Sequence, residues 1–91
     1  MEKARAHILV EGRVQGVYFR AYARNVAHGL GLSGWVRNLH DGRVEAVFEG
    51  RTEVIEQAIA ACREGPEGSS VRGIDVKWEP FAGEAGFEIL Y

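Results

Sequence analysis

Residues 12–20 read GRVQGVYFR and connect an apolar run, residues 8–10, to a run with helical character. A strand, a glycine-containing loop and a helix start predict an anion site, because the first amides of a helix lack intrahelical partners and carry about half a positive charge. Gly12 and Gly16 permit backbone conformations in which amides surround an oxyanion. Arg20 adds a permanent charge and a planar set of donors. We therefore expect this stretch to bind phosphate.

The loop differs from two familiar kinds of phosphate loop. A nucleotide-binding P-loop places Lys and then Ser or Thr after its last glycine, whereas Val17 and Tyr18 follow Gly16 here. A cysteine phosphatase needs a thiolate nucleophile, and this loop contains no Cys, Ser or Thr. We expect the loop to bind an anion without attacking it; the alternative is that it is only a turn.

Apolar periodicity predicts the elements on either side of the loop. Residues 6–12 alternate as a half-buried strand, with Ala6, Ile8 and Val10 on one face. The residues after the loop recur at helical spacing and form one stripe: Phe19, Tyr22, Ala23, Val26, Ala27 and Leu30. Gly31 is expected to end this helix as a left-handed cap.

A hairpin and a second helix follow. Residues 32–39 and 43–49 read as strands, and the Asp-Gly between them is a strong hairpin signal. On the second of these strands the apolar residues Val44, Ala46 and Phe48 are expected to face the core, and the charged residues Arg43, Glu45 and Glu49 to face solvent. A helix from about residue 52 is expected to end at Gly65-Pro66 and to bury Val54, Ile55, Ala58, Ile59 and Cys62. The final strands are expected at residues 71–79 and 86–90.

The order of these elements predicts one domain, residues 1–91, with an α+β fold. It is a ferredoxin-like α/β sandwich, βαββαβ, with two helices on one face of an antiparallel sheet and a short extra C-terminal strand. In this arrangement the first two strands are parallel and the third lies between them, so their carboxyl ends share an edge. Asn38 ends the second strand and is therefore expected to lie beside the loop of residues 12–20.

Asn38 shares a strand face with the apolar Val36, so it is expected to point toward the first helix. An amide can hold a water or donate to a substrate, but it cannot act as a base near neutral pH. We therefore predict a positioning role for Asn38. The alternative is a strand-end residue that only satisfies the hairpin.

The other chemically active residues are weaker candidates. Cys62 lies on an apolar helical stripe and is expected to be a core residue. His7 and His28 are expected to be structural or surface residues, and His40 lies near Asn38 in a turn where histidines are usually solvated. The glutamates do not combine with histidines in a metal-site pattern. We expect no metal and no cofactor.

The lack of an acid, base or metal favours one substrate class. An alkoxide leaving group usually needs such help, whereas a carboxylate, whose conjugate acid has a pKa of about 4, leaves unaided. We therefore predict hydrolysis of an acyl phosphate, in which electrostatic stabilisation and positioning suffice. Asn38 would hold the attacking water, and the expected phosphate-binding residues are Gln15, Gly16, Val17, Tyr18, Phe19 and Arg20.

Two motifs resemble the acylphosphatase family: GRVQGVYFR at residues 12–20 and GWVRNLHDGRVEA at residues 34–46. Gly65-Pro66 and Ser70-Val71 occur where such proteins usually have them, so the resemblance covers nearly the whole chain. It implies a small α/β sandwich that hydrolyses carboxyl phosphates without a metal. It also implies that Arg20 grips the phosphate and that Asn38 positions water.

Composition limits the partners. The formal net charge of −2 does not provide the basic field of a nucleic-acid binder. A single Cys cannot form an intrachain disulfide, and no segment resembles a signal or a membrane span. We expect a cytoplasmic monomer that acts on a small acyl phosphate, with inorganic phosphate as product and competitive ligand, and with no nucleic-acid or membrane partner.

Two other functions remain open. A noncatalytic phosphate-binding or regulatory module of the same fold would bind the anion without turnover. An RNA-binding sheet would need exposed aromatics and a basic surround; Trp35 can face outward, but the neighbouring glutamates and the negative net charge oppose this function.

Overall fold

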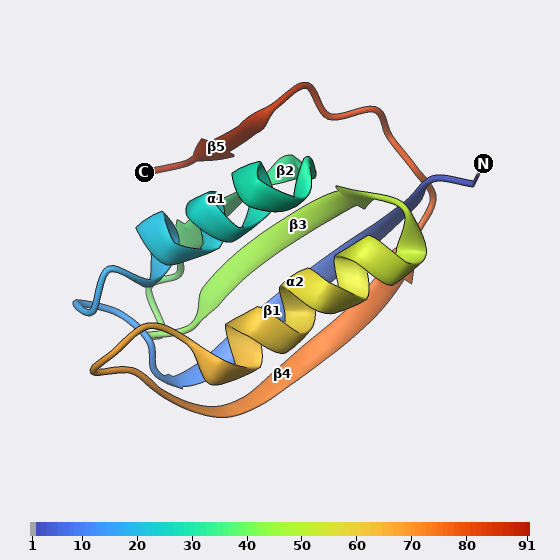
Figure 1. Ribbon diagram of the computed structural model, residues 1–91. Coiled ribbons are helices and arrows are strands. Elements are labelled where there is room, and N and C mark those ends of the chain that lie inside the picture. Colours follow the sequence, from blue (N-terminus) through green and yellow to red (C-terminus); the bar gives the residue numbers. More distant parts are fainter. Residues whose placement is uncertain (1) are drawn as a thin grey trace.

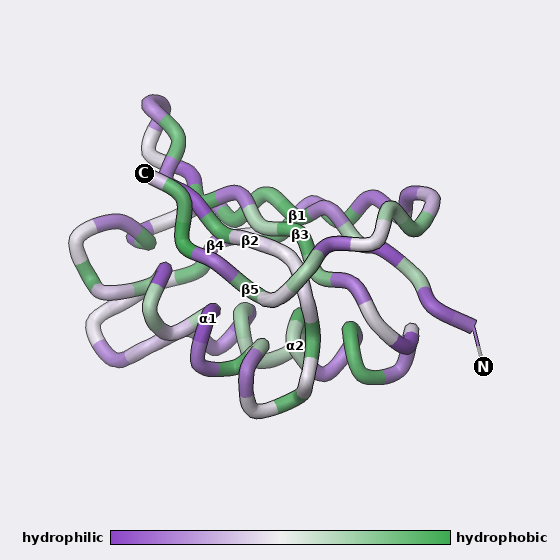
Figure 2. The backbone as a smooth tube through the Cα atoms, turned by 90° about the horizontal axis from the view of Figure 1, so that it is seen from above, coloured by the Kyte–Doolittle hydropathy of each residue, from purple (hydrophilic) through white to green (hydrophobic). Residues whose placement is uncertain are grey.

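The computed structural model describes residues 2–91. The elements follow in the order β1 (Ala4–Arg13), α1 (Phe19–Leu30), β2 (Ser33–Asn38), β3 (Val44–Gly50), α2 (Thr52–Glu64), β4 (Ser70–Glu79) and β5 (Phe87–Ile89). Both helices lie on one side of the sheet, as Figures 1 and 2 show from two directions. The prediction of a ferredoxin-like α+β sandwich is confirmed.

The sheet has the strand order β4-β1-β3-β2-β5. β3 is antiparallel to both β1 and β2, so these two strands run in the same direction with β3 between them, as predicted. The short extra C-terminal strand, β5, departs from the antiparallel pattern of the other strands, because it is parallel to β2. The reason is the crossover segment, residues 80–86, which carries the chain from β4 at one edge to the other edge of the sheet (Figure 1).

The core lies between the sheet and the helices. In β1, Ala6, Ile8 and Val10 are fully buried, as their alternation predicts. The helices bury one stripe each, made of Phe19, Ala23, Ala27, Ile55, Ala58, Ile59 and Cys62. Val54, predicted for the same stripe, is only partly buried. Burying a large aliphatic or aromatic side chain contributes about 1.5–3 kcal/mol, so this core gives the loops at the ends of the strands a firm support.

The expected helix ends are present. Gly31 follows α1 in the left-handed conformation, with φ 69°, and its amide donates to carbonyls of the last turn. Gly65 follows α2 and donates to the carbonyl of Ala61. Within residues 2–91, neither helix has the length and apolar character needed to cross a bilayer.

The outer face of β3 is less exposed than its alternating pattern predicts. Val47 is fully buried, and Glu49 retains only 2% of its exposure. The crossover segment explains the burial of Glu49, because its amides at Ala82, Gly83 and Glu84 donate to the Glu49 carboxylate at 2.7, 3.1 and 2.6 Å. The expectation that Glu49 faces solvent is therefore wrong.

Arg5 completes the surroundings of Glu49. Its guanidinium lies 3.1 Å from Glu49, 3.1 Å from Glu79 and 3.0 Å from Glu84. Burial alone would raise the pKa of Glu49, but the backbone amides and Arg5 outweigh burial and hold that pKa below its ordinary value. The crossover segment is thus fastened to the sheet by an ionised, hydrogen-bonded carboxylate.

Candidate functional site

The phosphate loop, defined as residues 14–18, and the hairpin of residues 39–43 lie at the same end of the sheet (Figure 1). They follow the carboxyl ends of β1 and β2, which are parallel. Between them lies a cavity of about 260 Å³ lined by Val14, Gly16, Tyr18, Phe19, Arg20 and Asn38. Arg20 and Asn38, separated by 17 residues in the chain, therefore face the same cavity.

The phosphate loop exposes the start of α1. Gly16 has φ 75°, and Tyr18, the N-cap of α1, has φ 61°. Within residues 2–91, Tyr18 is the only residue other than glycine with a positive φ, a conformation that costs about 1 kcal/mol. No side chain caps the helix, and its first turn contains no acidic residue. The first amides and the positive end of the helix dipole are thus free to attract an anion.

Arg20 is the second residue of α1 and is half-buried. Within residues 2–91 it forms no ion pair with a carboxylate. Its guanidinium carbon instead lies 4.9 Å from the centroid of the Tyr91 ring. No carboxylate in the described chain therefore neutralises the charge of Arg20. The sequence pattern gave no sign of its aromatic neighbour.

Asn38 is the last residue of β2 and is half-buried, two positions after the fully buried Val36. Within the described chain its side-chain amide has no hydrogen-bond partner. The hairpin is held by other groups, among them Asp41, whose carboxylate accepts from the Arg43 amide at 3.0 Å. The alternative in which Asn38 only satisfies the hairpin is therefore not what the structure shows.

The predicted phosphate-binding residues fall into two groups. Four of them, Gly16, Tyr18, Phe19 and Arg20, line the cavity, whereas Gln15 and Val17 do not. Val17 is partly buried against the core. The side chain of Gln15 turns to the hairpin, where its amide nitrogen donates to two backbone carbonyls. A contribution of these two residues to anion binding would come from their backbone amides.

Gly12 does not belong to the phosphate loop, contrary to expectation. It lies in β1 with φ 129°, at a bulge between Glu11 and Gly12 in the pairing with β4. A Cβ atom there would lie 2.1 Å from the carbonyl oxygen of Ser70. Gly12 is therefore required for the close approach of two strands rather than for surrounding an anion.

The other candidate groups lie outside the cavity. His40 is exposed in the hairpin, and His7 lies 2.6 Å from Glu45 on the outer sheet face. Burial raises the pKa of Cys62 to about 12, so it remains a thiol. Within residues 2–91, no three His, Cys, Asp or Glu side chains are grouped as metal ligands.

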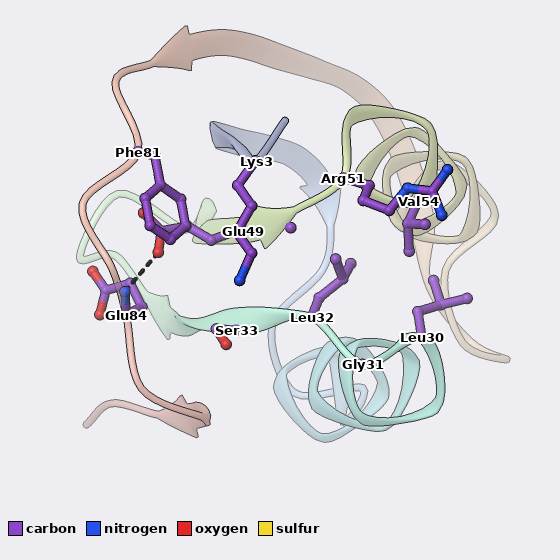
Figure 3. Close-up of a pocket in the computed structure, with 11 residues that line it drawn as sticks. Lys3, Leu30, Gly31, Leu32, Ser33, Glu49, Arg51, Val54, Phe81 and Glu84 are labelled. Atoms are coloured by element: carbon purple, nitrogen blue, oxygen red, sulfur yellow. Dashed lines mark hydrogen bonds between the residues drawn. The ribbon is translucent and has the colours of Figure 1, made fainter. Parts of the chain in front are cut away.

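A second cavity, of about 270 Å³, lies at the opposite end of the molecule, where α1 ends and α2 begins (Figure 3). Lys3 and Arg51 reach toward it, but Glu49 and Glu84 also line it. Both carboxylates are paired with Arg5. A phosphate there would meet two carboxylates, so this cavity is a poorer anion site than the one at Arg20 and Asn38.

The chain is similar to known proteins over nearly its whole length. A family model described as Acylphosphatase matches residues 6–89. The acylphosphatase of Roseiflexus sp. (strain RS-1) is 53% identical over 92 residues, covering 100% of this chain and 99% of that protein. The acylphosphatase of Aeropyrum pernix is 57% identical over 89 residues, covering 96% and 88%. The crystal structure of acylphosphatase from Bacillus subtilis superposes with a TM-score of 0.94 at 37% identity, covering 97% of this chain and 99% of that one.

The two motifs, the arrangement of the strands and the match over nearly the whole length point to the same conclusion: the chain belongs to the acylphosphatase family.

Proposed function

We propose that this chain hydrolyses the carboxyl–phosphate anhydride bond of acyl phosphates to a carboxylate and inorganic phosphate, without a metal. The observation that carries the proposal is the shared cavity. Among residues 2–91, the arginine that lines it has no ion pair, the asparagine amide has no hydrogen-bond partner, and the helix start has no side-chain cap. Membership of the acylphosphatase family supports the same activity.

Each part of the cavity would have its own task. The amides of the phosphate loop and the start of α1, together with Arg20, would bind the three phosphoryl oxygens and stabilise the charge that they carry in the transition state. Asn38 would hold a water opposite the leaving carboxylate. The water oxygen forms a bond to phosphorus as the bond from phosphorus to the carboxylate oxygen breaks, and the water proton passes to a phosphoryl oxygen or to solvent.

We propose that residues 1–91 act as a single domain and a monomer in the cytoplasm, where the free thiol of Cys62 would stay reduced. A nucleic-acid partner is disfavoured by the outer sheet face. There the ring of Trp35 is half-buried and lies 5.4 Å from the guanidinium of Arg37. Glu88 lies opposite Trp35, and Glu45 lies opposite Arg37.

An activity panel separates this proposal from a noncatalytic phosphate-binding module. The chain should hydrolyse acetyl phosphate and benzoyl phosphate, but should leave p-nitrophenyl phosphate almost untouched, because its site offers no acid for a poorer leaving group. Binding of inorganic phosphate without hydrolysis of either acyl phosphate would identify a binding module. Comparable hydrolysis of the ester would contradict the proposed substrate class.

A further inference from the structure

We propose that the side chain of Gln15 is a positioning residue that sets the distance between the phosphate loop and Asn38. Its amide nitrogen Nε2 donates to the carbonyl oxygens of Leu39 at 2.7 Å and Arg43 at 2.9 Å. Leu39 directly follows Asn38 in the chain. The inference rests on the proposed hydrolysis, because it assigns Gln15 a role in aligning the two halves of that site.

Backbone pairing does not fix this distance. The pairing of β1 with β3 ends at Val10 and Val44, and beyond Val10 strand β1 pairs only with β4. β2 stays paired with β3 as far as Asn38, opposite Val44. Within residues 2–91, no backbone–backbone hydrogen bond joins the phosphate loop to the hairpin. In the part of the chain that the structure describes, the two bonds from Gln15 are the only hydrogen bonds that join them.

The hairpin does not need Gln15 for its own closure. The amide of Leu39 donates to the carbonyl of Arg43 at 2.8 Å, and the amide of Gly42 donates to the carbonyl of Leu39 at 3.2 Å. Both carbonyls therefore keep a partner when the Gln15 amide is removed, which avoids the cost of an unpaired buried acceptor. What is lost is the link between two segments.

Among uncharged side chains, only those of Gln and Asn place two N–H donors on one nitrogen. Asn is one methylene shorter, so it cannot span the same gap. The pair of bonds at Gln15 thus depends on both its chemistry and its length.

The link matters because the two reacting groups would be held by different segments. The phosphate would be held by the loop and by Arg20, which belong to one continuous piece of chain, whereas Asn38 holds the water from β2. A misplacement of about 1 Å between reacting atoms can cost about 100-fold in rate. Loss of the Gln15 amide should therefore lower kcat while phosphate binding persists.

The test compares Gln15→Met, which keeps the length of the side chain, with the parent. With acetyl phosphate, kcat should fall by about 10- to 100-fold, with KM and the rise in melting temperature caused by inorganic phosphate close to those of the parent. Tyr22→Phe is the matched control, since it removes a side-chain bond to the Ala61 carbonyl, 2.8 Å long, between the two helices. Its kcat should equal that of the parent.

A double-mutant cycle shows whether Gln15 acts through Asn38. In the Asn38→Ala background, Gln15→Met should change kcat by no more than about 2-fold. In Gln15→Glu, the ionised carboxylate faces two carbonyl oxygens, so its kcat relative to the parent should be lowest at neutral pH. It should recover as the pH falls and the protonated carboxyl donates one bond.

Four results would overturn the role of Gln15 without affecting the proposed function. The first two are a kcat for Gln15→Met equal to that of Tyr22→Phe, and full additivity of Gln15→Met with Asn38→Ala. The other two are loss of the stabilisation by phosphate in Gln15→Met, and unfolding of both Gln15 variants, which would make the amide a structural requirement. A parent chain that binds phosphate without hydrolysing acetyl phosphate would instead overturn the proposed function, and this inference with it.

Discussion

The guanidinium carbon of Arg20 lies 4.9 Å from the centroid of the Tyr91 ring. Tyr91 therefore contacts the charged side chain that we expect to bind phosphate. β5 makes this possible. It runs parallel to β2 and extends toward the site, and the amide of Leu90 donates to the carbonyl of Val36 at 2.8 Å. The crossover segment therefore determines one neighbour of the phosphate site.

Removal of this ring should have a small effect on binding. An exposed cation–π contact contributes about 0.5–1 kcal/mol, so Tyr91→Ala should raise the KM for acyl phosphates by about 2- to 5-fold and leave kcat unchanged. Tyr91→Phe, which keeps the ring, should match the parent. A loss of kcat in Tyr91→Ala would mean that the ring acts on the chemical step and not only on the orientation of Arg20.

Substitutions of Arg20 and of Asn38 should affect phosphate binding and turnover differently. Arg20→Ala should lose both phosphate affinity and turnover, and Arg20→Lys should recover little of either, because a point charge cannot reproduce the planar donors. Asn38→Ala should lose turnover by about 100-fold or more if its amide acts like an oxyanion-hole donor. It should still be stabilised by phosphate in a melting experiment. Full activity of Asn38→Ala would contradict its assignment to the water.

Chelation should not change the activity. The predicted mechanism relies on amides, Arg20 and a leaving group that needs no acid, so dialysis against EDTA should leave kcat and KM for acetyl phosphate within error. A parallel sample with added magnesium is the control for effects of ionic strength. Activity that disappears with EDTA and returns with magnesium would disprove the metal-free mechanism.

Glu49 should make stability depend on pH in the acid range. Its pKa is below its ordinary value in the folded chain, so its contribution is present above the unfolded value of about 4.3 and is lost as the pH falls through the folded one. Glu49→Gln should cost about 2–4 kcal/mol at pH 7, because three backbone amides lose a charged acceptor and Arg5 keeps only its more exposed partners, Glu79 and Glu84. It should also flatten the fall in stability below about pH 4.3.

Urea unfolding at pH 7 and between about pH 5 and pH 3 measures both effects. Glu53→Gln is the control, since Glu53 pairs with Arg51 on the exposed surface and its loss should hardly move the midpoint. If the unfolding free energy of the parent and of Glu49→Gln falls equally as the pH is lowered, other carboxylates, such as Glu45, cause the pH dependence.

Tyr18 should be more tolerant of Gly than of Val. Its side chain is 86% exposed, so truncation removes little packing. At φ 61°, Gly avoids a steric cost of about 1 kcal/mol, which partly offsets its larger entropy in the unfolded chain, whereas a β-branched residue is strained. We expect Tyr18→Gly to exceed Tyr18→Val in unfolding free energy by about 1–2 kcal/mol, as measured by thermal or urea denaturation.

Local sequence patterns predicted most of the secondary structure and of the fold. The alternation in β1, the Asp41-Gly42 turn and the Gly31 cap are short-range signals, and the structure has all three. The parallel placement of β1 and β2 followed from the order of elements, and it brought Arg20 and Asn38 to one cavity.

The features that were predicted wrongly, or not predicted at all, depend on residues that are distant in the sequence. A glutamate that alternates with apolar residues looks solvent-facing, and nothing local to Glu49 indicates that residues 82–84 will surround it. Gly12 reads as a loop glycine until β4 lies beside it. The direction of the Gln15 side chain is likewise decided by a hairpin 24 residues away.

The position of β1 inside the sheet has a consequence for how the chain folds. Arg5 bonds to Glu79, a separation of 74 residues, and β1 pairs with β4 along nearly its whole length. Closing so large a loop lowers the chain entropy before the contacts that stabilise the pairing have formed. Proteins dominated by such pairings therefore fold slowly. During synthesis, β1 can pair along both of its edges only after residues 70–79 have been made. A shortened chain that lacks β4 would leave one edge of β1 unpaired and open to other molecules.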